Sequence, residues 1–361
     1  MMGKISMVSR HFVNESSSGN APFFTICIPC FNAGNSLRDC LSSIAVQDCG
    51  DYEVVVVDDG SVIPVRADDF GSLDLPCLRI VRIENSGPYA ARRAAFDAAR
   101  GEVIVCVDAD DGFLSDSALD AIKRVFDSAD PDVVLFNATS DGASRILDFS
   151  ALEGDSSFLD ACSVKRAFAT DFCLNSMWSK AFKKKLLTRD SAYRKQPRLL
   201  MAEDRLQSLE IVVGANSFSL VDEPLYFYKE NLGSTTHSAY KPEYYFQSCY
   251  VEDRVRESLD KLETRPGDWA TFFLRQTSSA LRGICCNRGL AKAQRREVYE
   301  RMNEEGSLLE AFRFGDFDAL PFSARVKLGL LKKRRYALLD ACMLPRTVGS
   351  LAKHILSGAR D

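Results

Sequence analysis

Short runs of β-branched and aliphatic residues alternate with helix-like patterns from Phe23 to about residue 140. This alternation is typical of a parallel sheet whose strands are connected by crossover helices. The runs predict strands over residues 23–29, 53–57, 78–83, 102–107 and 133–136. Helices are predicted to begin at Ser36, to span 88–100, and to lie between Ser115 and Pro131. We therefore expect an α/β fold with a doubly wound, mostly parallel sheet.

The pattern changes after this unit. Residues 163–187 look helical and basic, 203–213 look helical, and 218–228 alternate like a strand with a turn at Pro224. Beyond Pro242 only helix patterns follow, with breaks at Pro266-Gly267, Gly289, Gly306 and Pro321. We therefore expect three parts: a disordered N-terminal segment over 1–21, an α/β domain over 22–240, and a helical C-terminal region with a basic tail over 241–361.

Charge is unevenly distributed along the chain. The net charge of the 361 residues is −4, which argues against nucleic acid as a partner. Residues 323–361 hold nine Lys or Arg against two Asp, so this tail carries +7 and the rest carries −11. A basic tail on an acidic body suggests attachment to an anionic surface.

The twelve cysteines lie scattered through apolar runs and indicate reduced, buried thiols. Cys27 and Cys30 form a lone pair without further ligands at metal spacing. The first twenty residues are polar, and no apolar run reaches the length that spans a membrane. We therefore expect a cytoplasmic protein.

Two acidic clusters directly follow predicted strands, Asp58-Asp59-Gly60-Ser61 and Asp108-Ala109-Asp110-Asp111. Because ligands of open parallel sheets bind outside the carboxyl ends of the strands, these carboxylates are expected to converge on one crevice. Close carboxylates repel one another unless a cation neutralises them, and such oxygen ligands suit Mg²⁺ or Mn²⁺. The alternative is that each cluster is only a polar loop before a helix.

Seven stretches, spread in order over about residues 23 to 238, carry a resemblance to a known family. They are Ile28-Pro29-Cys30-Phe31-Asn32, Val57-Asp58-Asp59-Gly60-Ser61, Asn85-Ser86-Gly87-Pro88 leading to Ala91-Arg92, Gly101-Glu102 running into Asp108-Ala109-Asp110-Asp111, Trp178-Ser179-Lys180-Ala181-Phe182, Glu203-Asp204, and Asp222-Glu223-Pro224-Leu225-Tyr226 followed by Gly233-Ser234. In these motifs the chain resembles the inverting glycosyltransferases of family 2, which have the GT-A fold. The resemblance implies a GT-A glycosyltransferase domain over 22–240.

The resemblance also implies roles for single residues. It places Asp59 on the nucleotide base with Pro29 and Phe31 beside the ring, and Arg92 near the base or the diphosphate. Asp108 would hold the ribose and Asp110 the Mn²⁺ or Mg²⁺, which neutralises the leaving diphosphate. Asp204 would be the general base that deprotonates the acceptor hydroxyl, and its place at a helix start favours its ionised form.

Several assignments stay open at this point. Arg93 follows Arg92, so the sequence does not decide which arginine faces the donor, and Asp58 is an alternative or additional contact to the base. His237 is a candidate metal or diphosphate ligand, or only a loop residue. Lys180 is a candidate phosphate partner, or part of a solvated basic face over 180–185. Trp178 and the aromatics of 226–228 either stack on sugars or pack in the core.

The sequence thus favours a metal-dependent enzyme that transfers a sugar from a nucleotide donor, with UDP as the expected carrier, to a saccharide or lipid-linked saccharide. A non-catalytic module of the same fold, which binds a nucleotide sugar or another partner, is the alternative. In the tail, Lys332, Lys333, Arg334 and Arg335 interrupt an apolar pattern. This tail either attaches the protein peripherally to the anionic inner face of a membrane or packs on the catalytic domain. The apolar residues of this pattern are Leu328, Leu330, Leu331, Leu338, Leu339, Met343 and Leu344.

Overall fold

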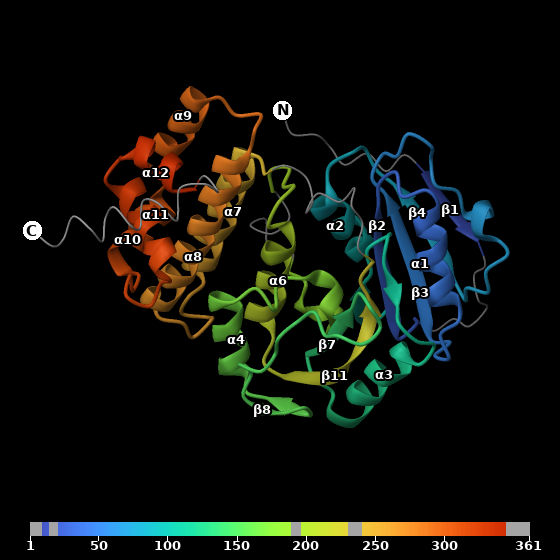
Figure 1. The fold of residues 1–361 in the computed structure, drawn as a ribbon. Coiled ribbons are helices and arrows are strands. Elements are labelled where there is room, and N and C mark those ends of the chain that lie inside the picture. Colours follow the sequence, from blue (N-terminus) through green and yellow to red (C-terminus); the bar gives the residue numbers. More distant parts are fainter. Residues whose placement is uncertain (1–8, 14–20, 189–195, 230–239, 344–361) are drawn as a thin grey trace, which may run out of the picture. The chain divides into compact units, whose positions relative to one another are not determined.

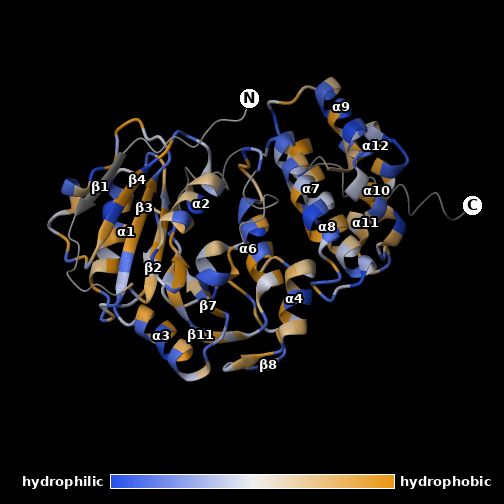
Figure 2. Cartoon of the chain, turned by 180° about the vertical axis from the view of Figure 1, so that it is seen from behind, coloured by the Kyte–Doolittle hydropathy of each residue, from blue (hydrophilic) through white to orange (hydrophobic). Residues whose placement is uncertain are grey.

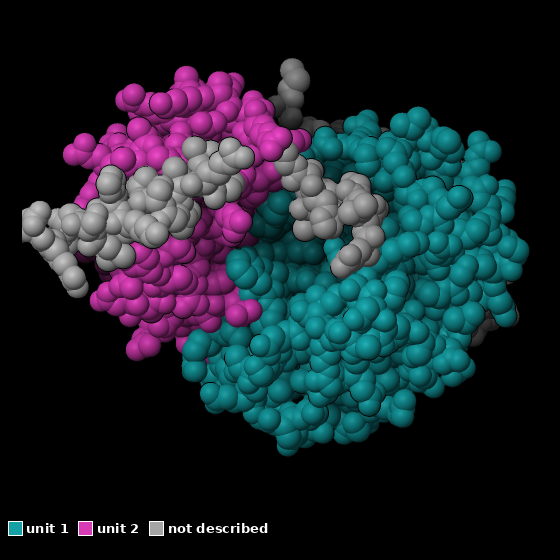
Figure 3. Space-filling model, viewed as in Figure 1, with its two compact units in different colours: residues 1–168, 172–232 teal, residues 169–171, 233–361 magenta. Residues whose placement is uncertain are grey.

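A computed structural model of the chain describes residues 9–13, 21–188, 196–229 and 240–343 (Figure 1). The chain divides into two compact units, coloured separately in Figure 3. Unit 1 comprises residues 1–168 and 172–232, and unit 2 comprises 169–171 and 233–361.

The centre of unit 1 is a mixed, mostly parallel sheet that contains eleven strands within the described residues. Four parallel strands follow the predicted runs: β2 (Phe24–Cys30), β3 (Tyr52–Asp58), β4 (Leu78–Arg82) and β5 (Val103–Cys106). Their order in the sheet is β4-β3-β2-β5, so the chain winds outward from β2 in both directions. This reversal beside β2 is the point at which doubly wound sheets form their ligand crevice.

Helix α1 (Asn35–Ala45) connects β2 to β3 and helix α2 (Pro88–Ala98) connects β4 to β5, while helix α3 (Ala118–Ala129) follows β5 in the chain. The prediction that Ser36 caps α1 is wrong. The helix begins one residue earlier, with Gly34 at the cap, and the Ser36 hydroxyl donates back to the carbonyl oxygen of Ala33 at 2.7 Å. The sequence therefore located this helix correctly and its cap wrongly, because a hydroxyl inside the first turn can bond backward instead.

The second half of the sheet holds β7 (Val133–Thr139) parallel to β11 (Phe218–Phe227), whose register shifts around Pro224. The short strands β6 (Gly112–Phe113) and β9 (Phe158–Leu159) each pair with β11, and β8 (Gly154–Asp155) pairs with β9. Helix α6 (Glu203–Gly214) precedes β11 where a helix is predicted.

The predicted basic helix over 163–187 is wrong. Helix α4 (Ala161–Thr170) ends early, and the short helix η2 (Met177–Ser179), strand β10 (Lys180–Lys183) and helix η3 (Lys184–Leu186) follow. Strand β10 lies antiparallel between β5 and β7, and all four of its residues are buried. Its lysines suggested a solvated helix face, whereas pairing on both sides places them inside the protein.

The sequence analysis also missed a strand near the N-terminus. Strand β1 (Ser9–Val13) pairs antiparallel with β4, within the segment expected to be disordered. Strand β4 would otherwise be an edge with unpaired backbone groups.

Side chains of β2, β3 and β5 contribute to the core of unit 1, and Figure 2 shows β2 and β3 in largely hydrophobic colours. Ile26, Val54 and Val105 have no exposed surface. Gly101 lets β5 begin against β2, because a Cβ there would lie 2.6 Å from the backbone of Phe24 and Thr25. Gly101 therefore serves the close packing of β5 on β2 as well as following the end of α2.

Unit 2 is helical in its described residues, as expected. Its helices are α7 (Pro242–Glu257), α8 (Pro266–Cys286), α9 (Lys292–Met302), α10 (Gly306–Phe314), α11 (Phe322–Lys332) and α12 (Tyr336–Met343). The buried Trp269 and Phe273 of α8 stack at 5.7 Å, and the Trp269 indole donates to Glu252 on α7 at 2.9 Å. In the described part of the chain, every helix is too short or too polar to cross a bilayer.

Candidate functional site

Asp58 ends β3 and is fully buried. Its carboxylate accepts hydrogen bonds from the backbone N–H of Ser61 at 2.8 Å and of Val65 at 3.2 Å, and it forms an ion pair with Arg82 of β4. These contacts fold the loop that follows β3. Asp58 therefore has a structural task that the sequence analysis did not foresee.

Asp59 organises the neighbouring loop. Its two carboxylate oxygens accept the backbone N–H groups of Ser86 at 2.7 Å and Gly87 at 2.8 Å, directly before α2. Burial raises the pKa of Asp59, and the two N–H donors oppose that rise. Asp59 thus holds the start of α2 beside the end of β3.

The loop after β2 carries two residues expected beside a nucleotide base. Pro29 is half-buried, whereas Phe31 exposes 52% of its surface. The next residue fixes the loop, because the Asn32 side chain accepts from Val62 N–H at 2.9 Å and its own N–H donates to the Ser61 hydroxyl at 2.9 Å. The Phe31 ring is therefore presented to solvent by an ordered loop at the carboxyl edge of the sheet.

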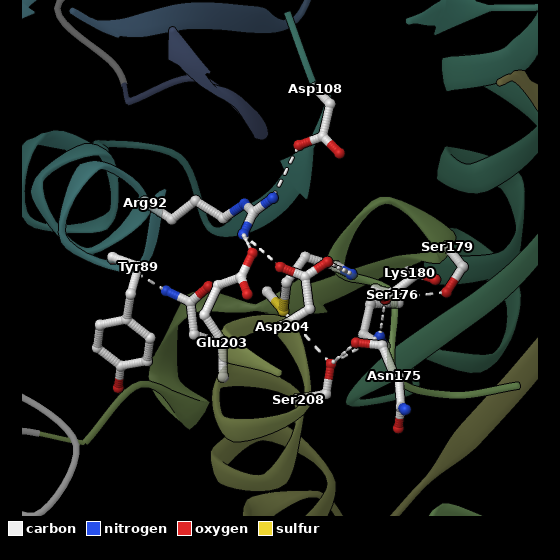
Figure 4. Close-up of polar contacts among 12 residues, drawn as sticks. Tyr89, Arg92, Asp108, Asn175, Ser176, Ser179, Lys180, Glu203, Asp204 and Ser208 are labelled. Carbon is white, nitrogen blue, oxygen red and sulfur yellow. Dashed lines mark hydrogen bonds and ion pairs between the residues drawn. The ribbon is translucent and has the colours of Figure 1, made fainter. Parts of the chain in front are cut away.

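Arg92 of α2 brings two distant carboxylates together (Figure 4). The guanidinium is 4% exposed, and its Nη2 donates to Asp108 at 2.8 Å. Its Nη1 forms an ion pair with Asp204 in the first turn of α6 and lies 4.0 Å from Glu203. One cation thus joins a carboxylate that follows β5 to the acidic pair that opens α6.

The acidic pair on α6 lies at the helix N-terminus, as expected, but its charge is controlled by burial. Burial and the neighbouring Asp204 raise the pKa of Glu203 to about 7, against the opposing effect of Arg92. Burial also raises the pKa of Asp204, and Arg92 again opposes the rise. Besides the helix dipole, Arg92, Lys180 and the Met177 N–H therefore favour the carboxylate of Asp204, against the effect of burial.

The structure separates the tasks of the two consecutive arginines. Arg93 is buried and forms an ion pair with Glu210 further along α6, and it also donates to the carbonyl of Thr188 at 3.3 Å. Successive helical residues point about 100° apart, so only one of the two can face the carboxyl edge of the sheet. Arg92 faces the acidic residues there, and Arg93 links α2 to α6.

The acidic cluster after β5 also divides. Asp111 is buried and accepts from the Tyr226 hydroxyl and the Lys229 N–H, both at 2.8 Å. Burial and the charges of Asp108 and Asp110 raise the pKa of Asp111 to about 7. The Asp110 side chain is half-buried and forms no hydrogen bond or ion pair with any residue that the structure describes. Asp110 is thus the member of the cluster that is available to an added ligand.

Metal ligation in this site is not evident from protein groups alone. Among the described residues, no group of three or more His, Cys, Asp or Glu side chains is arranged to hold a metal ion. His237, the other predicted ligand, lies outside the described residues. Mg²⁺ is usually held by only one or two carboxylates together with substrate phosphates, so this finding is compatible with an ion held by a single carboxylate and a diphosphate.

Lys180 does not lie on a solvated face. It has no exposed surface, and its ammonium donates to the carbonyls of Leu174, at 3.0 Å, and Ser176 and to the Ser208 hydroxyl at 3.0 Å. Burial lowers the pKa of Lys180 to about 8, and the charge of Asp204 limits the drop. Since an ammonium has three N–H donors, none is left for a phosphate. A lysine in a β-strand was not foreseen here, because the sequence pattern was interpreted as a helix.

The aromatic residues near the site pack on one another. Trp178 stacks on Tyr226 at 5.0 Å between ring centroids, and Tyr228 lies 6.0 Å from Trp178. Trp178 is 8% exposed and Tyr226 is fully buried, while Phe227 and Tyr228 are half-buried. For Trp178 and Tyr226 the alternative of core packing is therefore correct.

Comparisons with known proteins show what this chain is similar to. Residues 25–178 match the family model described as "Glycosyl transferase family 2". The chain is 22% identical over 290 residues to EpsH of Bacillus subtilis, a protein provisionally named a glycosyltransferase. This alignment covers 79% of this chain and 82% of EpsH. The chain is also 36% identical over 110 residues to the minor teichoic acid biosynthesis protein GgaA of the same organism. This shorter alignment covers 28% of this chain and 24% of GgaA.

The fold has a counterpart among solved structures. Residues 1–349 of S. aureus TarS, in complex with UDP-GlcNAc, superpose with a TM-score of 0.65 at 20% identity, over 89% of this chain and 90% of that chain. This likeness establishes the GT-A type of fold. On the match of residues 25–178 to the family model and the similarity to EpsH, the protein is a glycosyltransferase with a glycosyl transferase family 2 domain in this part of the chain.

Proposed function

We propose that this glycosyltransferase is a metal-dependent, inverting enzyme that transfers a sugar from a UDP-sugar to a hydroxyl of a saccharide or lipid-linked saccharide. The observation that carries the proposal is the bridge from Asp108 through Arg92 to Asp204. A carboxylate at the expected donor side and an acidic residue fit to accept a proton thereby share one small region. Inversion requires a base on the face of the sugar opposite to the leaving diphosphate, and Asp204 is the residue proposed for that place.

The donor would bind along the carboxyl edge of the sheet. The exposed Phe31 ring, with Pro29, offers an apolar surface for the base, and Asp59 orders the loop beside it. Asp58 folds the adjacent loop that follows β3. Asp108 would accept hydrogen bonds from the ribose, and Arg92 would lie near the diphosphate. Lys180 supports this site without touching the donor.

Asp110 would hold a Mn²⁺ or Mg²⁺ ion together with diphosphate oxygens, with His237 as the proposed second protein ligand. The bound ion would neutralise the charge that develops on the leaving diphosphate. Two observations support the fit. Asp110 has no hydrogen-bond or ion-pair partner among the described residues, and burial together with the negative charges of Asp108 and Asp110 raises the pKa of the neighbouring Asp111.

Asp204 would accept the proton of the attacking acceptor hydroxyl. A useful base must be ionised and within reach of that proton. The ion pair with Arg92 favours the carboxylate, and a quarter of the Asp204 side chain remains exposed and open to an acceptor. Glu203, whose pKa is raised to about 7, is the second residue to test.

The relatives suggest the class of product. The name of GgaA refers to teichoic acid biosynthesis, and the TarS structure contains UDP-GlcNAc. We therefore propose that the protein acts in the synthesis of a cell-surface polysaccharide or teichoic acid, and that a UDP-linked sugar is the first donor to test.

The basic tail would bring the cytoplasmic enzyme to the inner face of the membrane. Leu328, Leu331 and Leu339 are fully buried within unit 2, so an apolar face made of these residues is not available to lipid, contrary to that part of the expectation. The cations of residues 332–335 are exposed. Attachment would therefore be mainly electrostatic, with about 1 kcal/mol for each basic residue near an anionic surface.

The groove beside these cations is also basic. Arg334 and Arg335 line a cavity of about 640 Å³ together with Lys292 and Arg296. Leu344 and the residues after it lie outside the described residues. The described cations are sufficient to make the proposal testable.

A screen of nucleotide sugars by thermal shift, followed by hydrolysis or transfer assays with Mn²⁺, tests the proposed reaction. The expected result is stabilisation by a UDP-sugar and metal-dependent release of UDP. Binding without turnover, with every acceptor class tested, would instead support the non-catalytic module. Turnover that is unchanged in the presence of a chelator would contradict the proposed metal.

A further inference from the structure

Lys180 is a fully buried cation that the proposed reaction does not use directly. Placing an ammonium in the interior is costly unless its donors are paired. Here all three are paired, with the Leu174 and Ser176 carbonyls and the Ser208 hydroxyl. The burial of this charge therefore depends on one arrangement of the chain around it.

The three acceptors belong to the two segments that hold Asp204 (Figure 4). Ser208 lies one turn after Asp204 on α6, and its hydroxyl donates to the carbonyl of Asn175 at 2.8 Å. The same 174–177 loop places the Met177 N–H 3.4 Å from Asp204 Oδ2. Lys180 thus connects β10 to the loop and to the helix that contact the acidic side chain from two directions.

Charged and titratable groups from every neighbouring element face this lysine. Asp204 on α6 favours its protonated form, and so do Cys106 on β5 and Cys173 in the preceding loop, whereas Arg92 on α2 disfavours it. In return, the Lys180 charge favours the ionised form of Asp204. Lys180 and Arg92 are therefore two cations that act on the same carboxylate, one from the interior and one by direct contact.

We propose that Lys180 is a positioning residue for the base, which holds the 174–177 loop and the first turn of α6 so that Asp204 stays ionised and correctly oriented. This inference rests on the proposed role of Asp204. Lys180 itself touches neither donor nor acceptor, since its three donors are occupied and it is inaccessible to solvent.

Strand β10 offers a matched control. Lys183 is also buried, at 6% exposure, but its ammonium donates to the carbonyl of Asp130 at 2.9 Å and pairs with the Asp130 carboxylate. Replacement of either lysine by Met removes a buried charge from the same strand. Only Lys180→Met should disturb the base.

The experiment compares Lys180→Met, Lys183→Met and Ser208→Ala for kcat, for the UDP dissociation constant, and for the pH dependence of kcat. A misplaced catalytic group can cost ~10²-fold, so Lys180→Met should lower kcat by about that factor while the UDP dissociation constant changes by less than about twofold. The acidic limb of its kcat profile should move to higher pH. Ser208→Ala should give a smaller change in the same direction, and Lys183→Met should lower only thermal stability.

A folded Lys180→Met with the kcat and pH profile of the unchanged protein would overturn the proposal. If Lys180→Met does not fold, an unchanged pH profile in Ser208→Ala would do so. Asp204→Asn, measured in parallel, separates the two levels of inference. Near-normal transfer by Asp204→Asn refutes the base itself, whereas loss of transfer there with a normal Lys180→Met refutes only the positioning role. A double variant should be no slower than Asp204→Asn alone, because both changes act on one group.

Discussion

Arg92 and Asp204 form an ion pair that joins α2 to the first turn of α6 across 112 positions of the sequence. The same guanidinium also binds Asp108. A change in the position or charge of Asp108 can therefore affect Asp204, the proposed base, through Arg92 alone.

Replacement of Asp110 by Ala should abolish Mn²⁺-dependent binding of UDP, because this carboxylate is the member of its cluster without a protein partner in the described residues. Titration calorimetry of UDP with and without Mn²⁺ measures the effect. Asp116→Ala, at an exposed position nearby, is the control. Unchanged metal-dependent binding in Asp110→Ala would show that the metal lies elsewhere.

Replacement of Asp204 by Asn should lower kcat by ~10²–10⁴-fold, the usual loss when a positioned base is removed. The affinity for UDP should change little, since the donor does not need the base. Steady-state rates at saturating donor check this expectation, with Glu203→Gln as the companion variant. If Asp204→Asn transfers at a near-normal rate and Glu203→Gln does not, the base is Glu203.

Replacement of Arg93 by Met should destabilise unit 1 by about 3–5 kcal/mol, because it breaks the ion pair of Arg93 with the buried Glu210. The double variant with Glu210→Gln should recover much of this loss, since Gln can still accept from the Thr188 N–H that Glu210 binds at 2.7 Å. Urea unfolding of the three variants measures the coupling. A loss in Arg93→Met below about 1 kcal/mol would mean that this pair adds little.

Stability should depend on pH through Glu203. Its pKa is raised to about 7 in the folded protein, from an ordinary value of 4.5, so the folded state holds this proton more tightly than the unfolded chain does. The resulting stabilisation is complete below pH 4.5 and is lost as the pH rises to about 7. Glu203→Gln should flatten this part of the profile of unfolding free energy against pH, and Glu102→Gln, at an exposed position, should not. Parallel profiles for wild type and Glu203→Gln would contradict the shift.

The intact chain should sediment with vesicles that contain anionic lipid at low salt and should be released at high salt. A variant with residues 332–335 changed to Gln should stay in solution, because these exposed cations supply the attraction. Substitution is preferable to truncation near Pro321, which would remove the buried Leu328 and Leu331 from unit 2. Zwitterionic vesicles are the control. Equal sedimentation of the intact chain and the variant would show that residues 332–335 do not attach the protein to the vesicles.

The local pattern of the sequence was sufficient for the parallel strands and for the helical C-terminal region. Burial on both faces of a strand leaves an apolar run, and this signal needs no knowledge of the partner. The acidic clusters after β3 and β5 and the acidic pair at the start of α6 were also visible, because each lies at a chain position that a strand or helix end defines.

Only the tertiary structure decided which of these groups are already occupied. Asp58 is paired with Arg82, and Arg93 is paired with Glu210. The ammonium of Lys180 is bound by the 174–177 loop and by Ser208 of α6. The sequence could not separate Arg92 from Arg93, or recognise β10 as a strand, because each outcome depends on partners that are distant in the chain. Hydrogen bonding and ion pairing act over a few ångströms of space, whereas a sequence pattern reports mainly the burial and conformation of its own segment.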